Sequence, residues 1–226
     1  MTWKIGHRGA MGHAPENTLA SMKKALSFGV HGIEFDIQLS REGEPVVIHD
    51  DTLERTTNGK GPVSALSLHE LQALDAGGGE KIPSLRDVCD VVDKRCRLFV
   101  ELKAPASEGP VAELLTYYIE RLGWSYEQFF ICAFDHRQIA AVRARNPEFR
   151  TCALFAGIPV SLSEIALEAG AWAINPNIYH MDQSLVDDAH RRGLKVITWT
   201  ANTVHEIEKA RALGVDGIIS NYPDRL

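Results

Sequence analysis

The sequence predicts an α/β fold, a (β/α)8 TIM barrel, from three observations. Short apolar runs of strand length alternate with segments of helical periodicity along the 226 residues, and such alternation is typical of a parallel sheet. The alternation gives eight strands, seven of them followed by a helix, and eight such units close a barrel. An open doubly wound sheet is the alternative, but the sequence has no Gly-x-Gly-x-x-Gly loop after the first strand, which is typical of that fold. We therefore expect a single domain over residues 1–226.

The first strand and helix lie at the N-terminus. Residues 3–6 form a short strand that ends in His7-Arg8-Gly9, and a glycine-rich loop leads to Pro15-Glu16-Asn17-Thr18. The apolar residues of 19–28 keep helical spacing, and Gly29 ends that helix. Asn17 can cap it.

Residues 32–39 form the strand on which the predicted site is built. Glu34 and Asp36 alternate with apolar residues, so their carboxylates lie on one face, about 7 Å apart. Two carboxylates this close repel each other unless a cation lies between them. A hard divalent cation is the natural candidate, and a solvated polar face is the alternative.

A hairpin returns the chain toward these carboxylates. The polar turn at 41–45 is too short for a parallel crossover, so the strand at 45–49 is antiparallel. Folding the hairpin about the middle of the turn places Val46 opposite Leu39 and His49 opposite Asp36. An imidazole is thereby predicted beside the carboxylates.

Residues 51–83 interrupt the alternation of strands and helices, which predicts a small insertion after the second barrel strand. The segment contains a turn-rich run at 56–62, a short helix capped by Ser67 with Glu70, and three glycines at 77–79. Because it directly follows the histidine, we expect it to form a cap segment that lies over the barrel mouth and limits access by large groups.

The alternation of strands and helices resumes at Ser84. Serine, threonine and aspartate caps open most of the helices, and glycine or proline ends them. We expect helices at 84–93, 111–122, 135–146, 161–169, 182–192 and 203–213, and strands at 98–101, 129–132, 151–155, 171–175, 195–199 and 217–220.

Chemistry in such barrels lies at the C-terminal ends of the strands. Three of these ends are densely charged, namely His7-Arg8, Glu34-Phe35-Asp36 and Glu101-Leu102-Lys103. Glu101 and Lys103 share a face of their strand, where a purely structural ion pair is the alternative. The other ends carry Phe134, Phe155, Asn175, Trp199 and Asn221.

The charged ends predict chemistry on a phosphate. Oxygen ligands suit one divalent cation, Mg²⁺ or Ca²⁺, and a metal with local cations stabilises charge on phosphate oxygens. Two histidines can take one proton and give another. Trp199 offers an apolar wall to a small organic group, or else plugs the barrel. The candidates are Glu34, Asp36 and Glu101 for the metal, Arg8, Lys103 and Trp199 for substrate, and His7 and His49 for catalysis.

Composition limits the partners and the compartment. A net charge of −6 argues against a nucleic-acid surface. The four cysteines lack metal-ligand spacing and predict a reducing compartment. The first strand leaves no room for a signal peptide, and no apolar run has the length of a membrane span. We expect a soluble, cytoplasmic protein without stable membrane insertion, whose seven other histidines are structural.

Eight short motifs, in order from His7 to the C-terminus, resemble the glycerophosphodiester phosphodiesterases, in particular their compact bacterial-type members. Each motif is short, but their joint occurrence is specific. They are His7-Arg8-Gly9, Pro15-Glu16-Asn17-Thr18, Glu34-Phe35-Asp36, His49-Asp50, Arg55-Thr56-Thr57-Asn58-Gly59, Glu101-Leu102-Lys103, Thr198-Trp199-Thr200-x-Asn202 and Asp216-Gly217-Ile218-Ile219.

The resemblance implies a barrel with an insertion after the second strand and an Mg²⁺- or Ca²⁺-dependent hydrolase. Such an enzyme cleaves glycerophosphodiesters, for example glycerophosphocholine or glycerophosphoethanolamine, to glycerol 3-phosphate and an alcohol. The family's catalytic histidines fall on His7 and His49, its metal carboxylates on Glu34, Asp36 and Glu101, and its phosphate contacts on Arg8 and Lys103.

Four further positions are interpreted beside the resemblance. Ala133 and Asn221 depart from the family, in which serine and aspartate are frequent there, and we expect them to affect substrate preference rather than chemistry. Asn17 and Asp50 are interpreted as supporting residues, and Asp50 can orient His49.

The mechanistic hypothesis, taken partly from the resemblance, has a metal bind a phosphate oxygen and the glycerol 2-hydroxyl. One histidine removes the hydroxyl proton, the alkoxide attacks phosphorus, and the other histidine protonates the leaving alcohol. Water then opens the cyclic phosphate. The alternatives are a phospholipase-D-like or lysophospholipase-D-like barrel acting on lipid, and a non-catalytic ligand sensor. The absence of a basic amphipathic helix disfavours the first, and the complete set of site residues disfavours the second.

Overall fold

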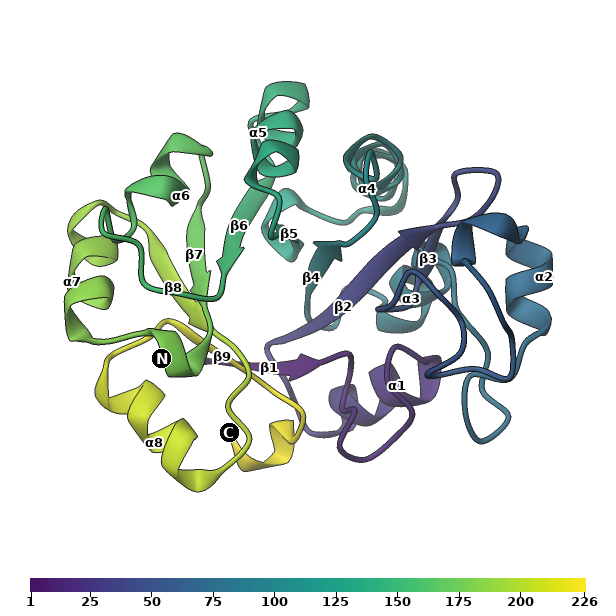
Figure 1. Cartoon of the computed structure of the whole chain (residues 1–226), viewed down its shortest axis with the longest axis horizontal. Coiled ribbons are helices and arrows are strands. Elements are labelled where there is room, and N and C mark those ends of the chain that lie inside the picture. The colour runs from purple at the N-terminus through teal and green to yellow at the C-terminus, as the bar shows by residue number, and fades with distance from the viewer.

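The computed structural model describes residues 1–226 as a closed barrel of parallel strands (Figure 1). This architecture confirms the predicted (β/α)8 fold. In their hydrogen-bonded order the barrel strands are β1 (Trp3–His7), β2 (Gly32–Leu39), β4 (Arg97–Leu102), β5 (Phe129–Ala133), β6 (Arg150–Phe155), β7 (Ala173–Pro176), β8 (Lys195–Thr198) and β9 (Gly217–Ser220), and β9 pairs with β1.

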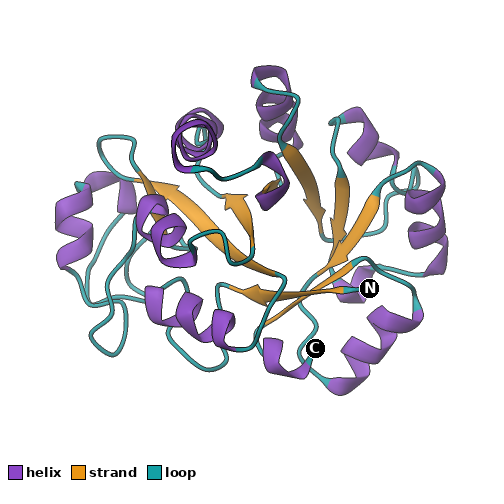
Figure 2. Cartoon of the chain, turned by 180° about the vertical axis from the view of Figure 1, so that it is seen from behind, coloured by secondary structure: helices purple, strands orange, loops and turns teal.

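Helices surround the barrel, as the view from behind shows (Figure 2). No helix combines the length and the apolar content needed to span a bilayer. The predicted start of a helix at Ser161 is wrong: Leu162 has φ +51°, so the helix begins only after Ser163. The helices are α1 (Leu19–Ser27), α2 (Leu68–Ala73), α3 (Leu85–Val92), α4 (Glu108–Leu122), α5 (His136–Arg145), α6 (Glu164–Glu168), α7 (Gln183–Arg191) and α8 (Val204–Ala212).

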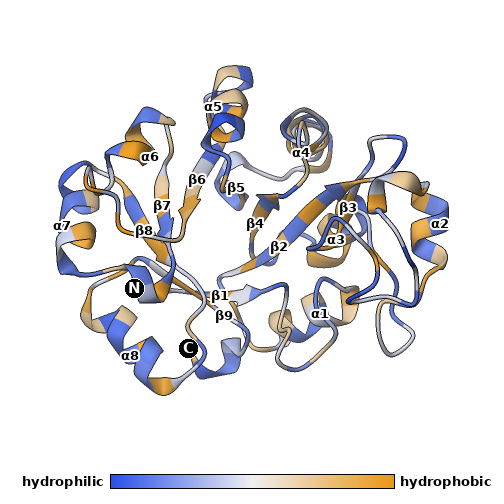
Figure 3. Cartoon of the chain, in the orientation of Figure 1, coloured by the Kyte–Doolittle hydropathy of each residue, from blue (hydrophilic) through white to orange (hydrophobic).

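The apolar core has two layers, one between strands and helices and one inside the barrel. Apolar residues accordingly follow the strands in Figure 3. At the N-terminal end of the barrel, Trp3 stacks on Trp172 with 5.9 Å between ring centroids. The packed interior leaves room for a site only at the C-terminal ends of the strands. The interior layer consists of Ile5, Phe99, Phe130, Cys132, Cys152, Leu154, Ala173, Ile197 and Ile219.

The hairpin strand β3 (Pro45–Val47) lies outside the barrel and pairs antiparallel with β2. The predicted register is wrong by one residue, because Val46 lies opposite Gln38 rather than Leu39. Ser40 donates its backbone N–H to the carbonyl of Glu44, so the loop has three residues and is centred on Glu42. Gly43 closes it at φ +81°, a conformation that glycine adopts without strain.

The segment 51–83 folds beside the barrel and packs against β3. It forms a small apolar cluster with Val46 and Ile48 of the hairpin and contains α2, whose N-cap Ser67 forms the predicted capping box with Glu70. The cluster consists of Val46, Ile48, Leu53, Val63, Leu71, Ala76 and Ile82.

Candidate functional site

Strand register brings the charged strand ends together. β2 lies between β1 and β4, so His7 pairs with Glu34 and Asp36 pairs with Glu101. The carboxylates of Glu34, Asp36 and Glu101 are buried, and one oxygen from each lies within 4.8 Å of the others. Three carboxylates thus converge although Glu101 is remote in sequence.

The carboxylate cluster is electrostatically frustrated. Burial raises the pKa of Glu34 well above its usual value, and the charges of Asp36 and Glu101 add to the effect. Burial, followed by the charge of Asp36, raises the pKa of Glu101 to about 7. Oε1 of Glu34 is buried without a hydrogen-bond partner. The cluster therefore lacks positive charge that a cation would supply.

Two cations of the protein flank the cluster. The Nε atom of Arg8 lies 3.3 Å from Oδ2 of Asp36. Lys103 donates to Oε1 of Glu101 at 2.8 Å and lies 3.7 Å from Oδ1 of Asp36. The ion pair between Glu101 and Lys103 is thus present, but as part of a larger charged site.

Arg8 occupies a strained backbone position with φ +49°, which costs an ordinary residue about 1–2 kcal/mol. Its N–H donates to Oε2 of Glu34 at 3.1 Å, and its carbonyl accepts from Ser21 Oγ at 2.7 Å. These bonds hold the turn after β1. Gly9 follows at φ +83°, and a Cβ there would collide with Ser21.

His7 is oriented by the last strand of the barrel. Its Nδ1 lies 2.6 Å from Oδ1 of Asn221, and its Nε2 lies 3.8 Å from Oε2 of Glu34. An acceptor at Nδ1 places the proton there and leaves Nε2 with a free lone pair. Burial, assisted by Arg8, lowers the pKa of His7 to about 4, so the ring is neutral at pH 7.

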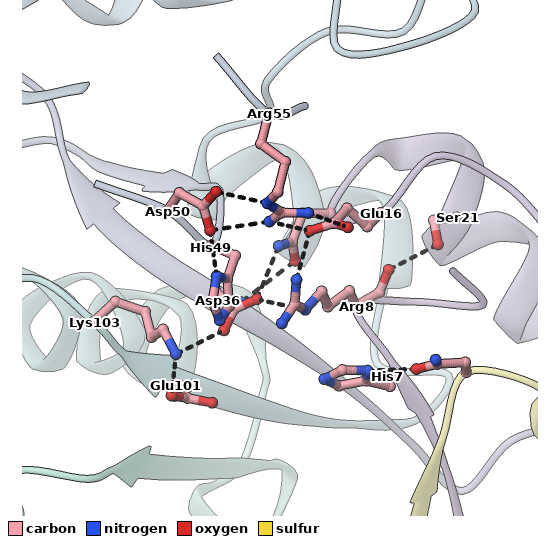
Figure 4. A network of polar contacts seen from close by, with 12 residues as sticks. His7, Arg8, Glu16, Ser21, Asp36, His49, Asp50, Arg55, Glu101 and Lys103 are labelled. Carbon is pink, nitrogen blue, oxygen red and sulfur yellow. Dashed lines mark hydrogen bonds and ion pairs between the residues drawn. The ribbon is translucent and has the colours of Figure 1, made fainter. Parts of the chain in front are cut away.

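His49 belongs to a chain of charged contacts (Figure 4). Its Nδ1 lies 2.6 Å from Oδ1 of Asp50, which accepts two hydrogen bonds from Arg55. Arg55 also donates two bonds to Glu16, and Glu16 accepts a bond of 2.6 Å from Arg8. The chain therefore connects His49 to Arg8. The hydrogen bonds from Arg55 to Asp50 hold the pKa of Asp50 well below its usual range.

Asn17 does not cap α1, because Thr18 is the N-cap residue. The buried Asn17 side chain instead donates to Oδ2 of Asp36 at 2.9 Å. Its φ of +58° is a conformation that asparagine adopts more readily than most residues.

A cavity of about 330 Å³ opens at this end of the barrel. Trp199 and Phe134 meet edge to face in its wall with 5.5 Å between ring centroids. No residue of 51–83 lines the cavity, although Arg55 of this segment contacts Asp50 and Glu16 beside it. None of the seven histidines interpreted as structural lines the cavity. The lining residues are His7, Arg8, Glu34, His49, Glu101, Lys103, Cys132, Phe134, Leu154, Asn175, Trp199, Thr200 and Ile219.

Three residues near the site were not among the candidates. Glu16 and Arg55 appear in the family motifs, but nothing local indicated that they contact each other. Asn221, which we expect to affect substrate preference, contacts His7, a candidate catalytic residue. Its position directly after the last strand was the available signal.

Comparison with known proteins identifies relatives that match nearly the whole chain. The family model described as "Glycerophosphoryl diester phosphodiesterase family" matches residues 7–225. A glycerophosphodiester phosphodiesterase of Caldanaerobacter subterraneus subsp. tengcongensis is 34% identical, with 100% of this chain and 96% of the relative covered. One of Bacillus subtilis is 30% identical, with coverages of 97% and 83%.

Solved structures show the same architecture. A phosphodiesterase of Oleispira antarctica in complex with the product sn-glycerol-3-phosphate superposes with a TM-score of 0.89, at 30% identity and coverages of 98% and 93%. A glycerophosphodiester phosphodiesterase of Agrobacterium tumefaciens gives 0.85 at 28% identity, with coverages of 100% and 98%. The chain belongs to the glycerophosphoryl diester phosphodiesterase family and is a phosphodiesterase of that family.

Proposed function

We propose that this enzyme is a metal-dependent hydrolase that cleaves glycerophosphodiesters, such as glycerophosphocholine or glycerophosphoethanolamine, to sn-glycerol 3-phosphate and an alcohol. The observation that carries the proposal is a cavity lined by two histidines, two cations and the carboxylates of Glu34 and Glu101, which form one buried cluster with Asp36. The product complex of the Oleispira antarctica phosphodiesterase supports the choice of substrate class.

The carboxylate cluster fits one hard divalent cation, Mg²⁺ or Ca²⁺. Its ligands would be Glu34, Asp36 and Glu101, all of which offer oxygen, and Glu34 retains a buried oxygen without a partner. Histidine and cysteine, which zinc prefers, do not belong to the cluster. When bound, the cation supplies Lewis-acid stabilisation of charge on the phosphate.

The protein's own residues then divide the remaining work. Arg8 and Lys103 hold the phosphate oxygens. His7, neutral and with Nε2 free, accepts the proton of the glycerol 2-hydroxyl, whose oxygen attacks phosphorus. His49, held by Asp50, donates a proton to the alcohol oxygen as its bond to phosphorus breaks. Water then opens the resulting cyclic phosphate, with the two histidines in exchanged roles.

We also propose that the enzyme acts in the cytoplasm. The four cysteines are free and buried, which suits a reducing compartment. The net charge of −6 supports a small-molecule substrate over nucleic acid.

Turnover with and without chelation tests the proposal. Purified enzyme is incubated with glycerophosphocholine, and choline and sn-glycerol 3-phosphate are measured in EDTA, then after addition of Mg²⁺ or Ca²⁺. We expect no turnover in EDTA and recovery with either ion. Glu34→Gln should be inactive, whereas Glu44→Gln, on the exposed side of the same hairpin, should match the wild type. Full activity in excess EDTA would refute metal dependence.

The lipid alternative is tested with vesicles that contain lysophosphatidylcholine. Under the proposal the enzyme neither sediments with the vesicles nor releases choline from them. Release from the lipid at a rate comparable with glycerophosphocholine would favour the alternative.

A further inference from the structure

The floor of the cavity differs from its charged wall. The floor is formed by Cys132, Leu154, Asn175 and Ile219, each at most 4% exposed, and Asn175 belongs to β7, across the barrel from β2. The rim is formed by Phe134, which is 46% exposed, and by the half-buried Trp199. The floor is thus a closed apolar end that contains one amide, and the rim is open to solvent.

The Asn175 amide has no partner in the protein. The side chain is fully buried at the end of β7, and both Oδ1 and Nδ2 lack a hydrogen bond. A buried amide without partners costs about 1–3 kcal/mol, so such a group calls for a ligand. Among cavity residues only Arg8 and Glu34 also have unpartnered buried polar atoms, and these are the proposed phosphate and metal residues.

The position of Asn175 is fixed by its backbone. Its carbonyl accepts a hydrogen bond of 2.9 Å from Nε1 of Trp199, and Asn175 pairs with Leu154 of the neighbouring strand. These contacts hold the backbone of Asn175 in place beside the cavity floor. The amide offers one donor group and one acceptor to whatever occupies the floor.

We infer that Asn175 is a specificity-determining residue that binds the terminal hydroxyl of the glyceryl group, an inference that rests on the proposed function. A hydroxyl accepts from Nδ2 and donates to Oδ1, and its methylene suits the apolar floor. The phosphate stays with the cations across the cavity, and the leaving alcohol points to the open rim. A quaternary ammonium group offers the amide neither a donor nor an acceptor, so the choline end does not suit the floor.

This placement accounts for selection against lipid. A lysophospholipid carries an acyl ester on the terminal oxygen, which then has no proton to donate to Oδ1. The buried floor, moreover, leaves no exit for an acyl chain. Asn175 would thus restrict the enzyme to deacylated substrates.

A thermodynamic cycle that combines a substitution of Asn175 with removal of one ligand hydroxyl tests the inference. Binding of sn-glycerol 3-phosphate is compared by calorimetry with binding of propane-1,2-diol phosphate, which lacks only the terminal hydroxyl, in Mg²⁺-loaded protein. The wild type should prefer the first roughly 10–100-fold. Asn175→Leu should reduce the preference to less than about threefold. Asn177→Ala, a control on the same loop whose side chain caps a short turn, should keep it.

Stability separates a binding role from a structural one. Because Asn175 makes no side-chain hydrogen bond in the protein, Asn175→Leu should keep or raise the Tm. If the leucine variant does not fold, Asn175→Ala takes its place in the cycle.

Three results would overturn the inference: an undiminished preference in the leucine or alanine variant, a change only in the ranking of choline, ethanolamine and ethyl diesters, or equal wild-type turnover of lysophosphatidylcholine. A wild type that neither binds sn-glycerol 3-phosphate nor hydrolyses its diesters would instead refute the proposed function.

Discussion

Replacement of Arg55 by alanine tests whether the segment 51–83 contributes to catalysis. Arg55 is the residue of this segment that reaches the charged chain of the site, where it joins Asp50, the partner of His49, to Glu16, the partner of Arg8 (Figure 4). Without it, Asp50 keeps its contact with His49 but loses the clamp that fixes its orientation.

The contacts of Arg55 determine how large the losses in stability and in kcat should be. Arg55 donates two bonds to Asp50, at 2.6 and 3.0 Å, and two to Glu16, both at 2.9 Å. Its side chain is 46% exposed, so water screens these pairs, and we expect a loss of about 1 kcal/mol in the free energy of unfolding. This corresponds to a fall in Tm of roughly 2–4 °C. Loss of a partner behind a metal ligand costs about 10–100-fold in activity, and we apply the lower end of this range to His49, the proposed general acid. We expect roughly tenfold in kcat, because Asp50 itself remains.

The assay measures kcat and KM for glycerophosphocholine in Arg55→Ala, Asp50→Asn and the double variant. If Arg55 acts through Asp50, the double variant should be no slower than Asp50→Asn alone. Arg41→Ala is the matched control, because Arg41 is 54% exposed and pairs with Glu70 away from the site. Additive losses in the double variant, or wild-type kcat in Arg55→Ala, would refute the reasoning.

Three further predictions concern the charged groups of the site. Glu34→Gln should raise the Tm of the metal-free protein and abolish the Tm increase caused by Mg²⁺ or Ca²⁺. The folded-state pKa of Glu34 is raised, so its charge destabilises the folded protein as pH rises above the unfolded pKa, and the advantage of Glu34→Gln in calorimetry should grow with pH; a lower Tm would contradict this. On an aryl ester of glycerol 3-phosphate, whose phenolate leaves without a proton, His49→Ala should recover activity and His7→Ala should not; recovery of only the latter would exchange their roles, and recovery of neither would refute the two-histidine scheme. Asn221→Asp should raise the pKa of His7 from about 4, because a carboxylate favours the imidazolium, so the acid limb of kcat/KM should move to higher pH; an unmoved limb would show that His7 is not the base.

The barrel and the charged strand ends were predictable because their signals are local. Strand-length apolar runs, capping residues such as Ser84 and Thr203, and the pairs Glu34/Asp36 and Glu101/Lys103 can be read within a few residues. The rule that barrel chemistry lies at strand C-termini then places these pairs together.

The contacts behind the site were not predictable, because they join residues remote in sequence. Arg55 meets Glu16 across 39 residues, and Asn221 meets His7 across 214. The prediction of the hairpin register was wrong for a different reason. A left-handed Gly43 closes a three-residue loop, and this detail of turn geometry shifts every pairing by one position.

The contact between His7 and Asn221 has a consequence for how the enzyme is made. His7 lies in the first strand of the barrel, and its partner follows β9, the strand that closes the barrel against β1. Such long-range pairing forms late, after the intervening units have docked. During translation, the nascent chain therefore carries its carboxylates and histidines for most of its synthesis without an assembled site. A chain that terminates before β9 lacks both the closing strand and the hydrogen-bond partner of His7, so we expect truncated products to be inactive.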